Sequence, residues 1–235
     1  MSGRRPARVG IEEVPNQIFI GCPWKTVRPK YERCIDQLRK KYPLSFVIIG
    51  RQDGQEAEDL LANIKERLLQ SSFAVFDASS GNANVSLEFG FSEAQDIPRA
   101  LYVSTHGAAK QSSETPIIAD LAGKKRNQYK QESGLLKLLN QLCSDHPYTI
   151  RFERFVHQTF RNYSKGSKKR PRALALKIIH CLDGSRDVRR TDVVQKMLAD
   201  TGKYDRQEID DMIRKLHSAG LIKSLQGPHS KVTIV

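Results

Sequence analysis

Residues 73–90 read FAVFDASSGNANVSLEFG, and this stretch decides how the rest of the chain is interpreted. Its first four residues form a short apolar run that is typical of a buried strand and leads directly into Asp77. A loop rich in Ser, Gly and Asn follows, and we expect a short helix through Glu88. The order of strand, loop and helix predicts that two carboxylates, Asp77 and Glu88, lie at the mouth of one cleft.

Three more apolar runs and three amphipathic patterns extend this arrangement in both directions. We expect strands at residues 18–21, 46–50 and 100–103, and helices over residues 31–38, 60–69 and 135–142. Residues 106–132 are polar and predict an irregular segment. Because strands and helices alternate, the sequence predicts an α/β domain with a doubly wound parallel sheet, covered on both faces. Ligands bind at the carboxyl ends of such strands, so residues 21–28, 50–54 and 77–88 should line one cleft.

The C-terminal third has a different pattern. Residues 164–171 combine Ser, Gly, Lys, Arg and Pro and predict a basic linker. Helical patterns follow at 174–182, 191–198 and 205–219, with Gly220 as the cap of the last helix, and two strands flank a turn at residues 227 and 228. This order and length resemble a winged helix-turn-helix. The predicted organisation is therefore an N-terminal tail (1–15), an α/β domain (16–163), the linker (164–171) and a winged-helix domain (172–235).

The charge of the 235-residue chain is uneven. The formal net charge is +13, and residues 151–235 hold 19 Lys+Arg against 9 Asp+Glu, whereas residues 1–150 hold 20 against 17. Such a basic segment favours binding to a polyanion, because neutralised phosphates release counterions. The candidate nucleic-acid contacts are Lys168, Lys169, Arg170, Arg172, Arg189, Arg190 and Lys231. A solvated basic surface and docking to another protein are the alternatives, and the acidic start of the helix at 205–219 would repel phosphates.

Composition excludes several classes of protein. With 39% hydrophobic residues the chain is not mostly disordered. No apolar run is long enough to cross a bilayer and the N-terminus lacks a signal-peptide pattern, so we expect a cytoplasmic protein that has no membrane partner. The four cysteines are scattered without a C-x-x-C pair, which predicts reduced thiols and no metal site.

The chemistry expected at residues 77–90 is that of a sugar-binding site. Carboxylates stabilise or capture an oxocarbenium-like centre when an N-glycosidic bond breaks, while Asn side chains and loop amides hold hydroxyls or phosphates. Glu88 also has a structural interpretation, as a carboxylate near the start of a helix that the helix dipole stabilises. Spacing alone leaves both open.

The same residues carry a resemblance to a known family. Asp77, Asn82, Asn84, Val85, Glu88 and Gly90 match the signature of nucleoside 2-deoxyribosyltransferase-like proteins and related TIR-like domains, and the similarity covers roughly residues 16–105. The resemblance implies a flavodoxin-like sheet with Glu88 as the catalytic carboxylate, either a nucleophile on the anomeric carbon or an aid to loss of nicotinamide. Asp77 would orient or protonate the base, and Asn82 or Asn84 would hold the ribose. Ala83 and Leu87 depart from the family pattern, which leaves the substrate open.

Other residues of the predicted cleft are weaker candidates. Gly21, Trp24 and Asp53 are expected to contact substrate, and Trp24 could either stack on a base or act as a packing lid. The cations Lys25, Arg28 and Arg51 lie on the same predicted edge and could bind a pyrophosphate or only face solvent. His106 follows a predicted strand and could be an acid or base, or incidental.

The leading hypothesis is an N-glycosidase that acts on a nucleotide, either NAD or a deoxynucleotide, as substrate and without a cofactor. A winged-helix module would bind nucleic acid or a partner, and the protein is expected to be an oligomer. In architecture alone this combination resembles effectors of bacterial antiphage systems such as retrons. The rivals are a non-enzymatic DNA-binding regulator that senses a nucleotide, and a scaffold whose two domains are interaction surfaces.

Overall fold

The computed structural model describes residues 11–50, 57–79, 82–105, 125–162, 169–182, 189–199, 202–225 and 231–234. By internal contacts the chain divides into two compact units. The N-terminal unit comprises Met1–Asp36 and Phe46–Leu139, and the C-terminal unit comprises Gln37–Ser45 and Asn140–Val235. Within the described ranges, none of the helices has the length and apolar character that a membrane span requires.

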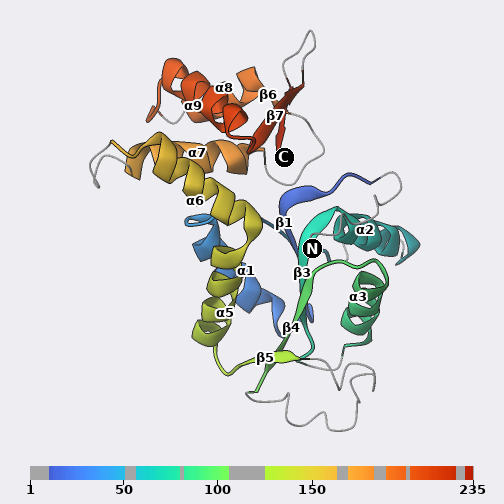
Figure 1. Cartoon of the computed structure of the whole chain (residues 1–235). Coiled ribbons are helices and arrows are strands. Elements are labelled where there is room, and N and C mark those ends of the chain that lie inside the picture. The colour runs from blue at the N-terminus through green and yellow to red at the C-terminus, as the bar shows by residue number, and fades with distance from the viewer. Residues whose placement is uncertain are drawn as a thin grey trace, which may run out of the picture. The chain divides into compact units, whose positions relative to one another are not determined.

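The N-terminal unit is built on a five-stranded parallel sheet (Figure 1). Its strands are β1 (Val14–Gly21), β2 (Ser45–Val47), β3 (Ser71–Asp77), β4 (Arg99–Ser104) and β5 (Arg126–Tyr129). They lie in the order β2-β1-β3-β4-β5, which is consistent with a flavodoxin-like fold. The predicted α/β class and the parallel sheet are thus confirmed.

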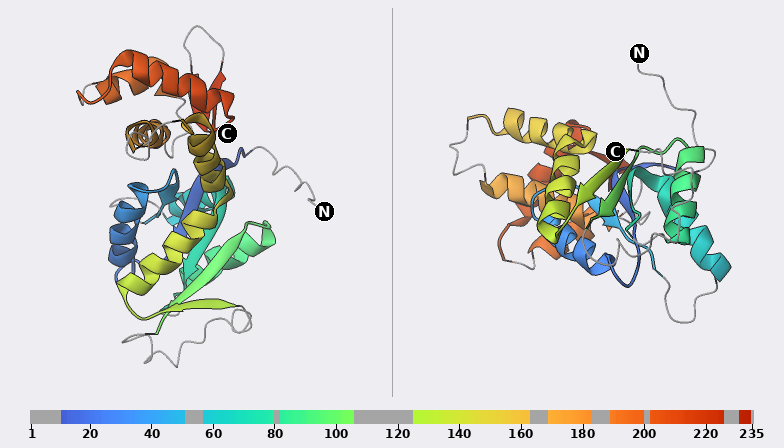
Figure 2. Two further views of the ribbon diagram at one scale, coloured as in Figure 1. Left: turned by 60° about the vertical axis from the view of Figure 1, so that its left-hand side comes forward. Right: turned by 90° about the horizontal axis from the view of Figure 1, so that it is seen from below.

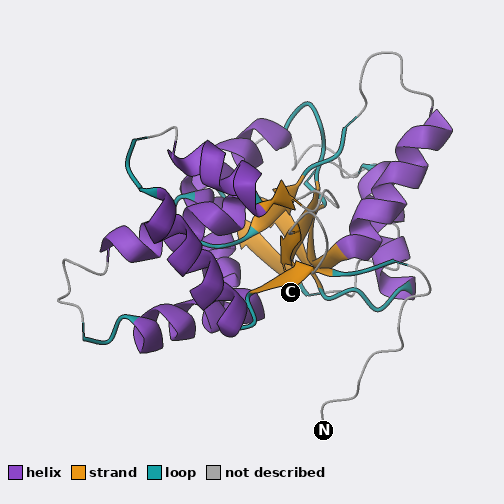
Figure 3. Cartoon of the chain, turned by 90° about the horizontal axis from the view of Figure 1, so that it is seen from above, coloured by secondary structure: helices purple, strands orange, loops and turns teal. Residues whose placement is uncertain are grey.

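Helices cover both faces of this sheet. They are α1 (Arg28–Arg39), α2 (Ala57–Gln70), α3 (Ala83–Ala94) and α5 (Glu132–Asp145). Helices α1 and α5 lie on one face and α2 and α3 on the other in Figures 1 and 2, and the same layering is visible in Figure 3, where strands are orange and helices purple. An ion pair of 2.7 Å between Arg33 and Glu132 joins α1 to α5.

An apolar cluster between the sheet and the pair α2 and α3 fixes the position of α3. Its buried members are Phe19, Leu68, Ala74, Phe76, Ala78, Val85, Phe89, Ile97 and Leu101. The Phe76 ring is central, with its centroid 6.1 Å from that of Phe19 on β1 and 5.5 Å from that of Phe89 on α3. Because such interiors are close-packed, these contacts hold α3 against the ends of β1 and β3.

The sheet differs from the prediction at two places. Residues 126–129, expected to be irregular, form the fifth strand, which pairs in parallel with β4. Its sequence RNQY lacks an apolar run because β5 is an edge strand, and only Tyr129 among its four residues is buried. The second strand ends at Val47 rather than at residue 50.

The C-terminal unit combines helices with a small antiparallel sheet. Its elements are α6 (Pro147–Thr159), α7 (Lys169–Cys181), β6 (Arg189–Arg190), α8 (Thr191–Ala199), α9 (Arg206–Ser218), β7 (Ile222–Leu225) and β8 (Lys231–Ile234). The strands lie in the order β6-β8-β7. The three predicted helices and the C-terminal pair of strands are confirmed, and Gly220 follows α9 with a φ of 65°, as its role as a cap requires.

Helix α6 is an element that the sequence analysis did not predict. It begins with Pro147 after the N-cap His146, whose side chain accepts a hydrogen bond from the backbone of Tyr148. Phe152, Phe155 and Val156 are buried on one helical face. A proline at the first helical position and apolar residues at spacings of three and four are the signals that could have identified it.

The predicted linker is partly helical. Lys169, Arg170 and Pro171 form the first turn of α7. A proline is compatible with this position because the first N–H groups of a helix have no acceptor within it. The preceding residues of the linker, including Lys168, lie outside the described ranges.

Candidate active site

A pocket of about 320 Å³ lies at the carboxyl ends of the parallel strands of the N-terminal unit. It is lined by Cys22, Trp24, Ile49, Gly50, Leu60, Ile64, Asn82, Asn84, Val85 and Glu88. The first four of these follow β1 and β2, and the last four are the N-cap residue of α3 and three residues from the first half of that helix. Three of the predicted substrate contacts, Trp24, Asn82 and Asn84, line this pocket together with Glu88, at the edge of the sheet where the sequence analysis expected a cleft.

Glu88 is held at the pocket wall by α3. The helix begins after Asn82, whose side-chain oxygen caps it by accepting a hydrogen bond of 2.9 Å from the backbone of Asn84. A Cβ atom on Gly21 would collide with Glu88 Oε2 and with the Phe76 ring, so the carboxylate lies directly over the end of β1. Gly21 therefore provides the space for Glu88 rather than a wall of the pocket.

The Glu88 carboxylate has an unusual environment. Burial raises its pKa to about 7. Within the described ranges, no side chain donates a hydrogen bond to it or forms an ion pair with it. At neutral pH the group is consequently present in both protonation states, which is the condition under which a carboxyl group can act as acid, base or nucleophile.

Asp77 has a different environment from the one predicted. It ends β3 with no exposed surface and is not among the residues that line the pocket. Its oxygens accept hydrogen bonds from the hydroxyls of Tyr31 (2.9 Å) and Tyr129 (2.7 Å), and from the backbone N–H (3.0 Å) and hydroxyl of Ser79. The prediction that Asp77 and Glu88 share one cleft mouth is therefore wrong, because protein donors enclose Asp77.

These contacts explain the ionisation of the Asp77 group. Burial raises the pKa of Asp77, and the hydrogen bonds from Ser79, Tyr129 and Tyr31 oppose that rise. Burial, reinforced by the Asp77 charge, also raises the pKa of both tyrosine hydroxyls, which stay protonated and remain donors. Sequence analysis missed Tyr31 and Tyr129, since Tyr31 is one apolar position of a helix and Tyr129 belongs to the unpredicted strand β5.

Trp24 forms one wall of the pocket. Its indole ring fills the space that a side chain at position 50 would need, and 45% of the residue is exposed. The Arg28 guanidinium lies 3.4 Å from the ring centroid and its Nε donates to Glu32 at 2.6 Å. Arg28 thus covers one face of the indole and is not part of the pocket lining, and its buried Nη1 has no hydrogen-bond partner among the described residues.

The structure describes one of the four remaining predicted cleft residues. Lys25 is exposed and is not part of its lining. Asp53, Arg51 and His106 lie outside the described ranges.

The apolar side chains of Ile49, Leu60 and Ile64 line the pocket but were not predicted as site residues, and Cys22, which also lines it, lies in the predicted cleft segment 21–28 but was not singled out. Burial, reinforced by Asp77, raises the pKa of Cys22 to about 12, so this thiol is protonated at neutral pH and is not a nucleophile. The signal that could have found Cys22 is its position directly after β1. All four cysteines are free, as predicted.

The predicted nucleic-acid contacts are dispersed over the C-terminal unit. Arg170 pairs with Glu208 at 2.9 Å, and Arg172 pairs with Glu153 at 2.5 Å and donates to the backbone oxygen of Lys41. Lys169 is exposed at the start of α7. The strand pairing places Arg190 opposite Lys231, and Arg189 opposite the next residue of β8.

The acidic start of α9 has a structural explanation. Asp205 accepts a hydrogen bond of 2.7 Å from the backbone of Glu208, whose carboxylate accepts one from the Asp205 backbone in return. This reciprocal pair is a capping box. Asp211 forms an ion pair with Arg214 at 2.6 Å.

In the part of the chain that the structure describes, no group of three or more His, Cys, Asp or Glu side chains could hold a metal ion. Comparison with protein-family models and with curated proteins gives no match for this chain.

Proposed function

We propose that the chain is an N-glycosidase that acts on a nucleotide, with NAD or a deoxynucleotide as substrate and Glu88 as the catalytic carboxylate. The observation that carries this proposal is the Glu88 side chain itself, which lines the pocket, has no partner among the described residues and has a pKa raised to about 7. A carboxylate that is buried without a partner is destabilised, and such groups concentrate at functional sites.

The pocket suits a nucleoside. Its volume of about 320 Å³ is at the lower end of the range for small-ligand sites. Trp24 and the apolar side chains of Ile49, Leu60 and Ile64 offer surface to a base, while Asn82 and Asn84 offer amide groups to sugar hydroxyls. The amide of Asn84 is the more available of the two, since the side-chain oxygen of Asn82 caps α3.

The proposed chemistry follows from the position of Glu88. As the bond between the anomeric carbon and the base nitrogen breaks, its electron pair leaves with the base and positive charge develops on the sugar. The ionised Glu88 either stabilises that charge until water attacks, or forms a covalent bond to the anomeric carbon that water or a second base then breaks. The first route is hydrolysis, and the second allows transfer.

In this proposal Asp77 is a positioning residue. Its hydrogen bonds join the end of β3 to α1 through Tyr31 and to β5 through Tyr129. Ser79 extends the same network, because its hydroxyl accepts a hydrogen bond of 2.7 Å from the backbone of Ser104 on β4. Asp77 thereby fixes the strand ends beside the pocket and has no surface with which to contact a base.

The test is base release by the wild-type protein and by Glu88→Gln, incubated with NAD and with deoxynucleotides and followed by chromatography. We expect release by the wild type and a loss of at least about a hundredfold in the variant, because the amide cannot stabilise the developing charge. Glu93→Gln is the matched control, since it makes the same change on α3 outside this pocket, where Glu93 pairs with Arg99. Equal activity of wild type and Glu88→Gln would refute the catalytic role.

We further propose that the C-terminal unit is a winged helix that binds nucleic acid and so regulates the enzyme. The support is the chain order α7, β6, α8, α9, β7, β8 and the three-stranded antiparallel sheet in which β8 is central. The excess of positive charge in residues 151–235 favours a polyanionic partner.

The second candidate is a non-enzymatic DNA-binding regulator whose pocket senses a nucleotide. The positive charge of residues 151–235 favours it too, because an enzyme that acts on a small molecule does not need a basic C-terminal unit. The same substitution distinguishes the two. If the protein binds a nucleotide but no base is released under any condition, and Glu88→Gln binds the nucleotide unchanged, the regulator is the correct function.

A further inference from the structure

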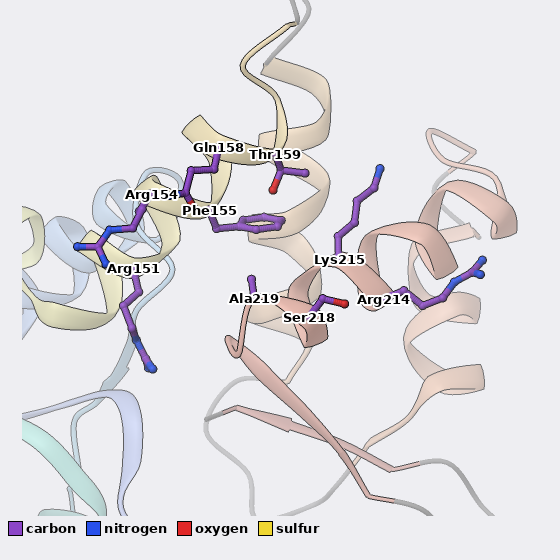
Figure 4. Close-up of a pocket in the computed structure, with 9 residues that line it drawn as sticks. All are labelled: Arg151, Arg154, Phe155, Gln158, Thr159, Arg214, Lys215, Ser218 and Ala219. Carbon is purple, nitrogen blue, oxygen red and sulfur yellow. The ribbon is translucent and has the colours of Figure 1, made fainter.

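The largest side chain in the pocket between α6 and α9 of the C-terminal unit is the Phe155 ring, which lies between the two helices (Figure 4). This α6–α9 pocket has a volume of about 480 Å³. The charged ends of its cations, Arg151, Arg154, Arg214 and Lys215, point away from the pocket in Figure 4. They therefore do not converge on a ligand, and the Glu88 pocket of the N-terminal unit carries the inference instead.

The wall that Trp24 forms in the Glu88 pocket has a cation behind it. The guanidinium carbon of Arg28 lies 3.4 Å from the centroid of the ring, so the guanidinium lies on one face of the indole. The turn between β1 and α1 positions both residues, because the backbone N–H groups of Val27 and Arg28 each donate a hydrogen bond of 3.2 Å to the Pro23 oxygen. The stack thus follows from the local course of the chain.

Gly50 confines the same ring from a second side. A Cβ atom at this position would lie 1.3–2.2 Å from three carbon atoms of the six-membered ring of Trp24. That edge of the indole therefore lies directly against the Gly50 backbone. Trp24 nevertheless lines the pocket and is exposed, so part of the ring surface remains open to a ligand.

The position of Arg28 is explained by its contact with the indole. Its Nε donates a hydrogen bond of 2.6 Å to the exposed Glu32. Its Nη1 is buried and has no hydrogen-bond partner among the described residues. Because a buried donor without an acceptor costs free energy, a guanidinium placed for hydrogen bonding alone would turn this group to water. Arg28 instead lies flat on Trp24, where a cation and an aromatic face attract each other.

The Arg28 charge does not set the ionisation of Glu88. Burial raises the Glu88 pKa, and within the described ranges no cation contributes to that shift. Removal of the guanidinium should consequently change the position of the indole and leave the protonation of Glu88 as it is.

We propose that Arg28 is a positioning residue, which holds the Trp24 indole as the surface on which the base of the nucleotide stacks. A base on the face that Arg28 leaves open would complete a stack of guanidinium, indole and base. Bases of every kind stack on aromatic side chains, and a ring that is already fixed loses less freedom when the ligand binds. This inference rests on the proposed function, since it takes the ligand to be a nucleotide.

The first test needs no ligand. Trp24 is the single tryptophan of the sequence, so tryptophan fluorescence reports on this ring alone. Time-resolved fluorescence anisotropy compares the full wild-type chain with Arg28→Gln and with Arg33→Gln. Arg33→Gln is the matched control, because it makes the same change on α1 in an ion pair with Glu132. We expect faster local motion of the indole in Arg28→Gln and wild-type motion in Arg33→Gln.

The second test measures ligand affinity by calorimetry in the Glu88→Gln protein, in which turnover is prevented. Arg28→Gln, Arg33→Gln or Gly50→Ala is added to it, and Gly50→Ala displaces the indole while it keeps the Arg28 charge. The ligands are deoxyadenosine and its 5′-monophosphate, and nicotinamide riboside and its 5′-monophosphate. Each pair shares a base and differs in the phosphate, so a lost base contact is distinguished from a lost phosphate contact. Melting temperatures check that each variant is folded.

We expect Arg28→Gln and Gly50→Ala each to weaken the binding of nucleoside and nucleotide alike by about tenfold. This is toward the lower end of what the loss of a base stack costs, since the ring is displaced and not removed. Arg33→Gln should stay within about threefold of the parent protein, because its ion pair is exposed.

The kinetics of base release give a further readout, with Glu88 restored. Arg28→Gln should raise KM by about tenfold and leave kcat within about threefold, because the stack is made equally in the ground state and in the transition state. The pH profile should be unchanged, since Arg28 does not set the ionisation of Glu88.

Three results would overturn the inference. They are wild-type anisotropy in Arg28→Gln, unchanged affinity despite a mobile indole, and a loss of affinity confined to the phosphorylated ligands, which would make Arg28 a phosphate contact. If the parent protein binds none of the four ligands, the stacked base and the proposed function are both refuted. If binding depends on Arg28 as expected but the wild type releases no base, the inference holds and only the glycosidase proposal fails.

Discussion

At the scale of single residues, Glu88 shows how burial of a carboxyl group without a partner lowers stability. Its pKa is about 7 in the folded protein, against about 4.5 for the unperturbed group. The folded state therefore binds the Glu88 proton more tightly than the unfolded state does. By linkage, this group lowers the free energy of unfolding as the pH rises from about 4.5 to 7, and its effect is constant above that range.

Glu88→Gln should accordingly raise the free energy of unfolding at pH 8 by about 1–3 kcal/mol, because the amide carries no charge to bury. At pH 4, where the carboxyl group is protonated in both states, the same substitution should have little effect. Urea unfolding at the two pH values measures the difference. A variant equally stable to wild type at pH 8 would contradict the burial of an ionised carboxylate.

Gly21 and Gly90 offer a comparison of the same substitution at two positions. Gly21→Ala places a methyl group against Glu88 Oε2 and the Phe76 ring, and should lower stability by about 1–3 kcal/mol and reduce base release. Gly90 lies on α3, two residues after Glu88. A Cβ atom at this position has no other atom within 4 Å, so Gly90→Ala should stabilise the helix by about 1 kcal/mol. Thermal unfolding and the base-release assay of both variants provide the readout. Equal effects at the two positions would show that close approach of Glu88 does not explain Gly21.

At the scale of elements, the two ends of α9 differ in charge and in the contacts that they make. The acidic N-terminal turn carries the capping box of Asp205 and Glu208, while the C-terminal turn contributes Lys215 to the α6–α9 pocket. This distribution also suits the helix dipole, which favours negative charge at the N-terminus and positive charge at the C-terminus. Asp205 and Glu208, two of the acidic residues that argued against nucleic-acid binding by this helix, thus cap its N-terminus.

Asp205→Ala should therefore destabilise the protein by about 1 kcal/mol, since it leaves the first N–H groups of α9 without an acceptor. Asp205→Asn retains the acceptor and should behave like the wild type. Chemical unfolding monitored by circular dichroism compares the two. An equal loss in the two variants would indicate that the charge of Asp205, which both remove, and not its capping hydrogen bond, stabilises the helix.

At the scale of the whole molecule, hydrophobic periodicity predicted the buried strands and the amphipathic helices. It failed for elements and side chains whose environment depends on residues far away in the sequence. Buried strands such as β1 and β3 are continuous apolar runs, and Glu88 follows β3 at a short distance in sequence, so both could be predicted. The edge strand β5 has no such run, and the burial of Asp77 depends on Tyr31 and Tyr129, which lie 46 and 52 residues away. The α6–α9 pocket likewise requires two helices whose pairing no local pattern reveals.

The hydrogen bonds around Asp77 have a consequence for how the protein opens. The carboxylate is satisfied by groups from α1, β5 and the segment after β3, and detachment of any one of these leaves buried oxygens with fewer donors. Partial detachment is therefore unfavourable, and the three segments should move away from the end of β3 together, in a single cooperative fluctuation. Amide hydrogens at the carboxyl ends of β3 and β4 would then exchange with solvent at one shared rate. Between such openings, the end of β3, α1 and β5 should move as one rigid body beside the Glu88 pocket.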